Sequence, residues 1–426
     1  MNSNYSANDW RSITAIQKFA SIPFTLAVLI QTYSYFIIFY KYNEIEINSL
    51  GQFLLDVSYP IRNMCLYINV AILLITKRLT KDGVFLIFGS VFAILFTSIA
   101  YPENMPFFED IQAMFILAIQ MYVVIRSRFV NMAILKVCLM WINRVFAIVS
   151  IYVFLTYQTS LIFIQNYMDY ANGISIICGL SAYFAIIEKK KLDCVFMAIM
   201  YIVLLIAGGR GSFLTMALLT LVLFWITKRN NRKTQKYFVT GAIVLSLALV
   251  VSTFLSDLSS LIGFESRNLE RLTEGGFFYA NDRTSIWSEL INKSSNNILL
   301  GSGICADRYY LSNANLATSG YYAHNIFVEM MVDFGLIGIV IFCAILFLFR
   351  RFFTRISSPE ILGFVSVYVF VSFVQLFLSR SFLTEANFYV MLALMVNYLE
   401  TNMYNNEYYQ LYENKKTISY SNYPNL

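Results

Sequence analysis

Apolar runs close to the length that crosses a bilayer recur along the whole chain, and this recurrence constrains the fold more than any single motif. A spanning helix needs about 20 mostly apolar residues. Only 13% of the 426 residues are charged, against about a quarter in a soluble domain. We therefore predict an all-α, polytopic integral membrane protein with about twelve transmembrane helices and one large external loop. The predicted runs begin near Ile16, Ser58, Gly83, Ile111, Met132, Tyr170, Leu192, Ser212, Tyr237, Asn325, Glu360 and Phe382.

Charge alternates between successive connections. Connections that begin near residues 77, 126, 189, 228 and 350 are rich in Lys and Arg, whereas those at 41–56, 101–110 and 156–169 are acidic or neutral. Short loops rich in Lys and Arg remain in the cytoplasm, so both termini are predicted to lie inside. The predicted parts are N-terminal transmembrane helices at 1–256, the large outer loop at 257–323, C-terminal transmembrane helices at 324–400 and a cytoplasmic tail at 401–426.

Motifs for cofactors and metals are missing from the sequence. The six cysteines show no CxxC spacing, so neither a disulfide framework nor a zinc site is supported. The chain also has no Walker loop and no GxGxxG fingerprint. We predict no cofactor, no metal and no nucleic-acid partner; the lipid bilayer is the first partner.

Two short motifs place an arginine on the outer side. Arg210 stands at the apex of the turn Gly208 to Ser212, and Arg283 lies in the stretch Asn281 to Trp287. A plain helix–helix turn and a short helix start with an exposed arginine remain alternatives. Arginine near a bilayer is costly and usually functional, which favours a ligand. Trp287 is predicted to contact the same ligand.

A third motif is the turn Leu300 to Cys305, with Arg308 shortly after it. Gly301 and Gly303 allow the backbone to approach a ligand closely. A simple turn explains these glycines equally well, and Arg308 is alternatively a solvated loop residue. The interpretation as a binding turn adds Gly301, Gly303 and Arg308 to the predicted substrate-binding residues.

The single histidine, His324, directly precedes an apolar run. Asn325 suits the N-cap of the following helix and is a further candidate for substrate binding. Glu329 and Asp333 are four residues apart, on one helix face, and should point into the protein. A helix N-terminus disfavours an imidazolium, so a neutral imidazole there is suited to accept a proton. The alternative is a purely structural histidine.

Arg380 adds a cation in the last outer turn, and its alternative role is that of an interfacial anchor. Arginines grouped at the outer face suggest a phosphate or diphosphate ligand, because the guanidinium fork matches phosphate oxygens. No acidic pair suited to hold a metal stands beside them, which favours a metal-free site.

In this order, the motifs "GGRGS", "DRTSIW", "LLGSGI" and "AHNIFVEMMVDFGLIG" resemble the O-antigen ligase and polymerase superfamily of bacterial envelopes. The resemblance covers Gly208 to Gly338. It implies glycan transfer from undecaprenyl diphosphate to a sugar hydroxyl at the periplasmic face of the inner membrane. Arg210 and Arg283 would then neutralise the diphosphate, and His324 would activate or position the acceptor hydroxyl. A proline that often precedes the Gly-x-Gly turn is absent, since Asn296 and Asn297 stand there.

Three activities remain open within this interpretation. The prediction is an O-antigen or surface polysaccharide polymerase, with undecaprenyl-diphosphate-linked glycans as donor and acceptor and a chain-length regulator as a further partner implied by the resemblance. The first alternative is a ligase that moves the finished chain to lipid A–core. The second is a transporter of lipid-linked sugar, although transporters often show paired halves and a midplane site, and no internal repeat is visible here.

Overall fold

A computed structural model of the protein describes residues 15–42, 49–157, 167–207, 210–228, 283–314, 322–378 and 380–402. Within these ranges every regular element is helical and no strand occurs. The all-α prediction is therefore confirmed for the described part. The predicted run at Tyr237, residues 257–282 and 315–321 of the predicted outer loop, and residues 403–426 of the tail lie outside it.

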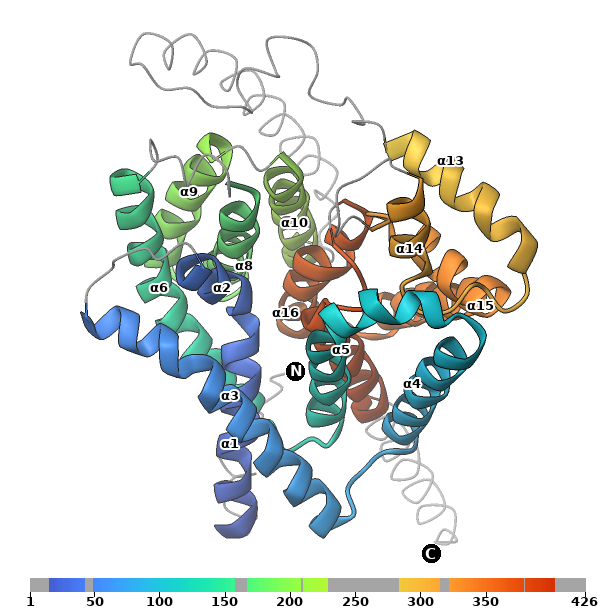
Figure 1. Ribbon diagram of the computed structural model, residues 1–426. Coiled ribbons are helices and arrows are strands. Elements are labelled where there is room, and N and C mark those ends of the chain that lie inside the picture. Colours follow the sequence, from blue (N-terminus) through green and yellow to red (C-terminus); the bar gives the residue numbers. More distant parts are fainter. Residues whose placement is uncertain are drawn as a thin grey trace, which may run out of the picture.

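The N-terminal part of the chain forms nine described α-helices up to residue 228. In chain order they are α1 (Ala15–Thr32), α2 (Ser34–Tyr42), α3 (Ser49–Thr76), α4 (Lys81–Ala100), α5 (Met105–Arg126), α6 (Met132–Tyr157), α8 (Tyr167–Ile186), α9 (Lys191–Ile206) and α10 (Arg210–Lys228). Helices α1, α2, α6, α8 and α9 lie together in one half of the molecule (Figure 1). Helix α8 is at its centre, in contact with α2, α6, α9 and α10.

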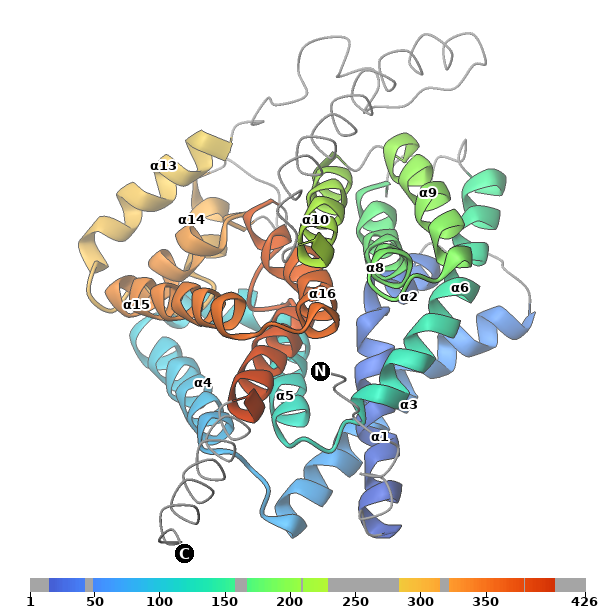
Figure 2. The ribbon, with the colours of Figure 1, turned by 180° about the vertical axis from the view of Figure 1, so that it is seen from behind.

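The C-terminal part contains shorter and more irregular elements. They are α13 (Arg283–Ser294), α14 (Ala306–Asn313), α15 (Ile326–Arg355), α16 (Pro359–Tyr368), the π-helical turn η3 (Val369–Phe373), the 3-10 turn η4 (Gln375–Phe377) and a last helix at 386–402. Helices α13, α14 and α15 pack on one another beside α4, while α10 and α16 lie between the two halves (Figure 2).

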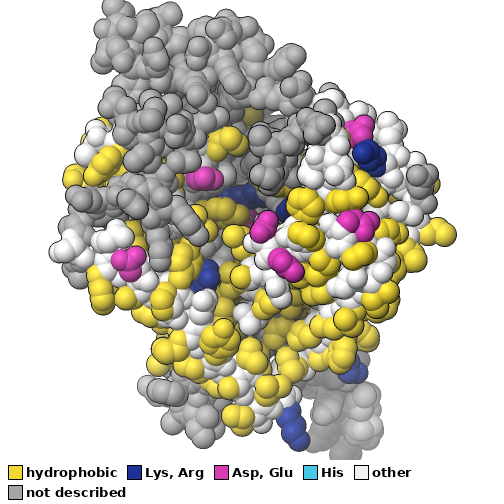
Figure 3. Space-filling model, in the orientation of Figure 1, with side chains coloured by type: hydrophobic (Ala, Val, Ile, Leu, Met, Phe, Trp, Pro, Cys, Tyr) yellow, Lys and Arg dark blue, Asp and Glu magenta, His cyan; other side chains and the backbone are white. Residues whose placement is uncertain are grey.

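Six helices are long and apolar enough to cross a membrane, or seven if the bent pair Ser21–Thr32 and Ser34–Tyr40 is one span. Twelve spans are therefore not confirmed. Helix α4 shows why lipid is the expected solvent: Phe85 is 75% exposed and Ile99 is 83% exposed. On the face seen in Figure 3, hydrophobic side chains are spread widely over the described surface. Contiguous apolar surface on this scale is unusual for a soluble monomer.

The predicted basic connections near residues 77, 126 and 189 lie at one end of the helices, whereas the one that begins near 228 continues outside the described residues. Arg126 binds Asp82 at 2.6 Å and Glu400 at 2.9 Å, and Lys136 binds Glu188 at 2.8 Å. We call this the basic end; it unites the starts of α4 and α6 with the ends of α5, α8 and the last helix.

The opposite ends of several of these helices meet the C-terminal elements. Thr97 Oγ1, near the end of α4, accepts the Ile304 N–H at 2.9 Å, and the Asn104 amide donates to the Ser302 carbonyl at 2.7 Å. Tyr35, just beyond the 59° bend between α1 and α2, donates to Glu385 at 2.8 Å. We call this the site end, because it holds His324 and the predicted site residues that surround it.

Candidate functional site

His324 lies in a tight loop immediately before α15. Its φ of 52° is in the left-handed region, which is uncommon for residues other than glycine. The preceding residue is held from both sides: the Ala323 N–H donates to Asp307 Oδ2 at 2.9 Å, and the Ala323 carbonyl accepts from Trp287 Nε1 at 2.9 Å. These two hydrogen bonds fix the backbone that carries the imidazole.

Trp287 and Asn325 thus both have structural partners around His324. The side chain of Asn325 accepts the N–H groups of Phe327 at 3.0 Å and Val328 at 3.4 Å, so the predicted N-cap of α15 is confirmed. Contact of either residue with a substrate stays a prediction.

Tyr322 connects His324 with the arginines of the site end. Its ring centroid lies 4.1 Å from that of the imidazole, and Arg308 Cζ lies 5.5 Å from the same tyrosine ring. Tyr322 also interacts electrostatically with Arg380. The single histidine therefore shares an aromatic neighbour with two of the predicted cations.

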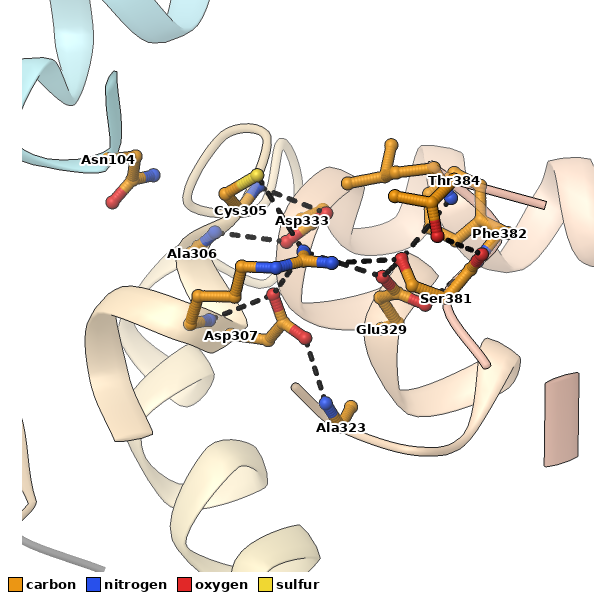
Figure 4. A network of polar contacts seen from close by, with 12 residues as sticks. Asn104, Cys305, Ala306, Asp307, Ala323, Glu329, Asp333, Ser381, Phe382 and Thr384 are labelled. Carbon is orange, nitrogen blue, oxygen red and sulfur yellow. Dashed lines mark hydrogen bonds and ion pairs between the residues drawn. The ribbon is translucent and has the colours of Figure 1, made fainter. Parts of the chain in front are cut away.

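A buried network of charged side chains is hydrogen-bonded to the loop that carries His324, through Ala323 and Asp307 (Figure 4). It contains three carboxylates that are 0% exposed, Asp307, Glu329 and Asp333, and one guanidinium, Arg308, that is 6% exposed. Arg308 Nη1 is 3.4 Å from Asp307 and 3.7 Å from Glu329, and Nη2 donates to Ser381 Oγ at 3.1 Å. The prediction that Glu329 and Asp333 point into the protein is confirmed.

Each carboxylate of this network binds the backbone of a different segment. Asp333 accepts the N–H groups of Cys305 at 3.3 Å and Ala306 at 3.1 Å, at the start of α14. Asp307 accepts from Ala323, and Glu329 accepts from Phe382 at 3.3 Å and from the Ser381 hydroxyl. Three segments that are distant in sequence are thereby tied to one cluster.

The interpretation of Arg308 as a solvated loop residue is wrong, because its side chain is buried in this network. Burial by itself lowers the pKa of the guanidinium, but the neighbouring carboxylates, Asp307 foremost, hold that pKa above its ordinary value. Arg308 is thus a fixed countercharge. A direct contact with substrate stays a prediction. Burial also raises the pKa of the Cys305 thiol, so this cysteine is poorly suited to act as a nucleophile.

The glycine turn approaches protein backbone closely. A Cβ on Gly301 would lie 2.4 Å from the Asp333 carbonyl oxygen, and one on Gly303 would lie 2.8 Å from Thr97 Oγ1. Both glycines have positive φ, at 73° and 84°. The turn fits against a kink of α15 at Gly335, whose φ is 59°. Packing therefore accounts for these glycines, and their contact with a ligand remains untested.

Arg380 is 3% exposed, so its interpretation as an interfacial anchor is wrong. Its Nη1 donates to the Val371 carbonyl at 2.8 Å and to Glu385 Oε2 at 2.7 Å. Its Cζ lies 3.9 Å from the centroid of the Tyr35 ring. Tyr35 and Glu385 were not predicted as site residues. Glu385 stands five positions from Arg380 in the sequence, but no local pattern points to Tyr35.

Arg210 and Arg283 are the first residues of α10 and α13; the structure does not describe their side chains. A Cβ on Gly211 would lie 3.4 Å from Leu378 Cδ1. The start of α10 therefore packs against Leu378, which is two residues before Arg380 in the chain. Arg283 is one helical turn before Trp287, which binds Ala323. The backbones of both arginines are thus linked to the site end through directly packed residues.

Among the described residues, no group of three or more histidine, cysteine, aspartate or glutamate side chains is arranged to hold a metal ion. The site end instead offers an imidazole, helix N-termini and guanidinium groups. Such a set can bind an anionic or polar ligand and can transfer a proton at one position.

Residues 195–343 match the model of a protein family described as O-antigen ligase. The chain carries an O-antigen ligase family domain. The match runs from α9 into α15 and includes Arg210, Arg283 and His324, while Arg380 lies beyond its end. This confirms the resemblance to the O-antigen ligase and polymerase superfamily. No curated protein matches the chain, and no solved structure matches it.

Proposed function

We propose that this membrane protein is an O-antigen or surface polysaccharide polymerase. It transfers the growing glycan from undecaprenyl diphosphate to a hydroxyl of a new lipid-linked repeat unit at the periplasmic face. The observation that carries the proposal is the placement of the single imidazole: His324 lies at the start of α15, inside the O-antigen ligase domain, on a backbone held by Asp307 and Trp287.

His324 accepts the proton of the acceptor hydroxyl in this mechanism. The N-terminus of α15 disfavours a positive charge on the imidazole, so the neutral form that can take a proton is favoured. The hydroxyl oxygen then attacks the anomeric carbon of the donor glycan as the bond to the diphosphate breaks. A single displacement of this kind inverts the anomeric centre.

Arg210 and Arg283 neutralise the diphosphate as it leaves. Each begins a helix, and the unpaired N–H groups of a helix start favour an anion at the same place. Negative charge develops on the leaving group during the reaction, so prepositioned donors lower the barrier more than they strengthen ground-state binding. No metal is needed for this step.

A ligase is the second candidate, and the description of the matched family favours it. It would use the same donor and the same leaving group but would deliver the finished chain to lipid A–core. The residues of the site end are compatible with either acceptor. The two activities are therefore distinguished by the products that they form.

The lipopolysaccharide banding pattern of a deletion strain tests the proposal. Loss of a polymerase leaves core plus a single repeat unit, because the separate ligase still works, and a plasmid copy with His324→Ala should give the same pattern. Bare core with long chains on undecaprenyl diphosphate would replace the polymerase by the ligase. Single-repeat lipid on the cytoplasmic face would exclude both and indicate a transporter.

A further inference from the structure

The segment from Gln375 to Asn387 contains buried polar atoms that lack partners. Arg380 Nε and Nη2, and both amide atoms of Gln375 and of Asn387, have no hydrogen-bond partner within the described part of the chain. These side chains are only 1–3% exposed. Buried polar groups in native proteins are nearly always hydrogen-bonded, so a concentration of unpaired ones on one segment points to a ligand.

The guanidinium of Arg380 is held so that one edge remains available. Both Nη1 bonds go to protein acceptors, the Val371 carbonyl and Glu385. The Tyr35 ring packs against the guanidinium, and its hydroxyl donates to the same Glu385 oxygen at 2.8 Å. Rotation would break these contacts. The Nε and Nη2 donors therefore present a fixed pair, the geometry that binds two neighbouring oxygens of one ligand.

Asn387 is linked to Arg380 through Glu385. Its backbone N–H donates to Glu385 Oε1 at 3.2 Å, while Arg380 binds the other oxygen of the same carboxylate. The side-chain amide of Asn387 offers both a donor and an acceptor. The ionised oxygens of a phosphate only accept hydrogen bonds. A sugar hydroxyl, in contrast, can accept a hydrogen bond from Arg380 and donate one to the Asn387 amide oxygen.

The charge balance favours a neutral ligand as well. Glu385 neutralises Arg380 at 2.7 Å, and the exposed Asp169 adds a second carboxylate within electrostatic range of the guanidinium. The described side chains here thus carry no excess positive charge for a diphosphate. Neutral sugar oxygens are bound without that requirement.

We propose that Arg380 and Asn387 form a sugar subsite beside His324. This subsite binds two neighbouring oxygens of the glycan, which belong to hydroxyl or acetamido groups. Glu385 and Tyr35 orient the guanidinium. The assignment rests on the proposed function for its glycan, and it replaces the expectation that Arg380 binds the diphosphate. The subsite lies beyond the matched domain segment and would contribute to the choice of sugar.

The test measures binding of the strain's own repeat-unit oligosaccharide, released from its lipid, to the purified protein in lipid nanodiscs. Undecaprenyl phosphate is the second probe. Arg380→Lys keeps the pair with Glu385 but removes the fixed edge, and Asn387→Leu removes only the amide. Each variant should weaken oligosaccharide binding about tenfold or more, as expected for lost hydrogen bonds in a buried site, with undecaprenyl phosphate binding unchanged.

Thermal unfolding separates this role from a structural one. Replacing an amide without partners by leucine should leave the unfolding midpoint unchanged or raised. Oligosaccharide binding equal to wild type in both variants overturns the subsite, and weaker undecaprenyl phosphate binding in its place makes Arg380 a phosphate ligand. If oligosaccharide binding depends on Arg380 while the wild type transfers no glycan between lipid-linked substrates, the proposed function fails and the sugar subsite stands.

Discussion

The ion pairs of Arg126 at the basic end differ in burial from those of Arg308 and Arg380 at the site end. At the basic end, Arg126 binds carboxylates that are 36% and 40% exposed, so its partners stay in contact with solvent. At the site end, the carboxylates bound to Arg308 and Arg380 are 0% exposed. Buried ion pairs contribute little net stability but are costly to break. The carboxylates around Arg126 can therefore be hydrated when the pair is broken, whereas those of the Arg308 network hold backbone segments in fixed positions.

The largest expected effect concerns sidedness, which should be all or none. Lys293→Cys places a thiol on α13 at the site end, where the lysine is 37% exposed, and Arg128→Cys places one at the basic end, where the arginine is 44% exposed. A membrane-impermeant maleimide should label the first in intact spheroplasts and the second only after permeabilisation. The native cysteines are replaced by serine or alanine in the background. Equal labelling of both thiols before permeabilisation would contradict opposite sidedness.

Removing one cation from each end should sharpen the comparison. Arg308→Gln leaves buried carboxylates without their countercharge and should lower the free energy of unfolding by about 3–5 kcal/mol. Arg126→Gln is the matched variant, and its effect should be smaller because Asp82 and Glu400 can be hydrated. Denaturant unfolding in detergent measures both. An equal loss of stability would remove the energetic distinction between the two ends.

Two glycine-to-alanine substitutions, one at the closely packed site end and one in α4, give a second comparison of stability. A Cβ on Gly335 would lie 2.4 Å from the Ile298 carbonyl oxygen, and its φ is 59°; Gly89 in α4 has nothing within 4 Å. Gly335→Ala should therefore destabilise by about 2–3 kcal/mol, while Gly89→Ala should be neutral or stabilise by up to about 1 kcal/mol. The same unfolding assay compares them, and a harmless Gly335→Ala would mean that the kink of α15 is not required.

Substitution of Asp307 tests whether the hydrogen bond to Ala323 positions the imidazole of His324. Asp307→Ala removes the acceptor of the Ala323 N–H and should lower kcat about tenfold, which corresponds to about 1.4 kcal/mol in the barrier. Donor binding should be retained, and Asp307→Asn should restore part of the rate because its amide oxygen can still accept. Glu289→Gln, in a partly exposed pair with Lys293, is the control. If Asp307→Ala weakens donor binding and leaves kcat unchanged, Asp307 does not act by positioning His324.

Hydropathy predicted the helices well, because a spanning helix is a local property of about 20 residues. Every predicted apolar run within the described part corresponds to a helix, and the N-cap at Asn325 and the inward face of Glu329 and Asp333 were also visible. Fewer of these helices than predicted meet the length and apolarity of a span. Shorter helices buried among others need not be long or apolar enough to cross alone.

The site was predictable only where its residues are neighbours in sequence. Arg308 is buried by Glu329, 21 positions later, and by Ser381, 73 positions later, and spacing alone cannot reveal such a partnership. The Tyr35 hydroxyl meets Glu385 across 350 positions. The glycines of the turn signalled a close approach correctly, but the partner is the backbone of α15 and the sequence does not distinguish it from a ligand.

In the proposed mechanism, glycosyl transfer at the site end depends on His324. The most direct test of this dependence is single-turnover transfer by purified protein in lipid nanodiscs, with lipid-linked repeat units as donor and acceptor. His324→Ala should slow transfer about 10²–10⁴-fold, the usual cost of removing a general base, while donor binding and the unfolding midpoint stay those of the wild type. Transfer at the wild-type rate by the folded His324→Ala protein would contradict a role of His324 in proton transfer.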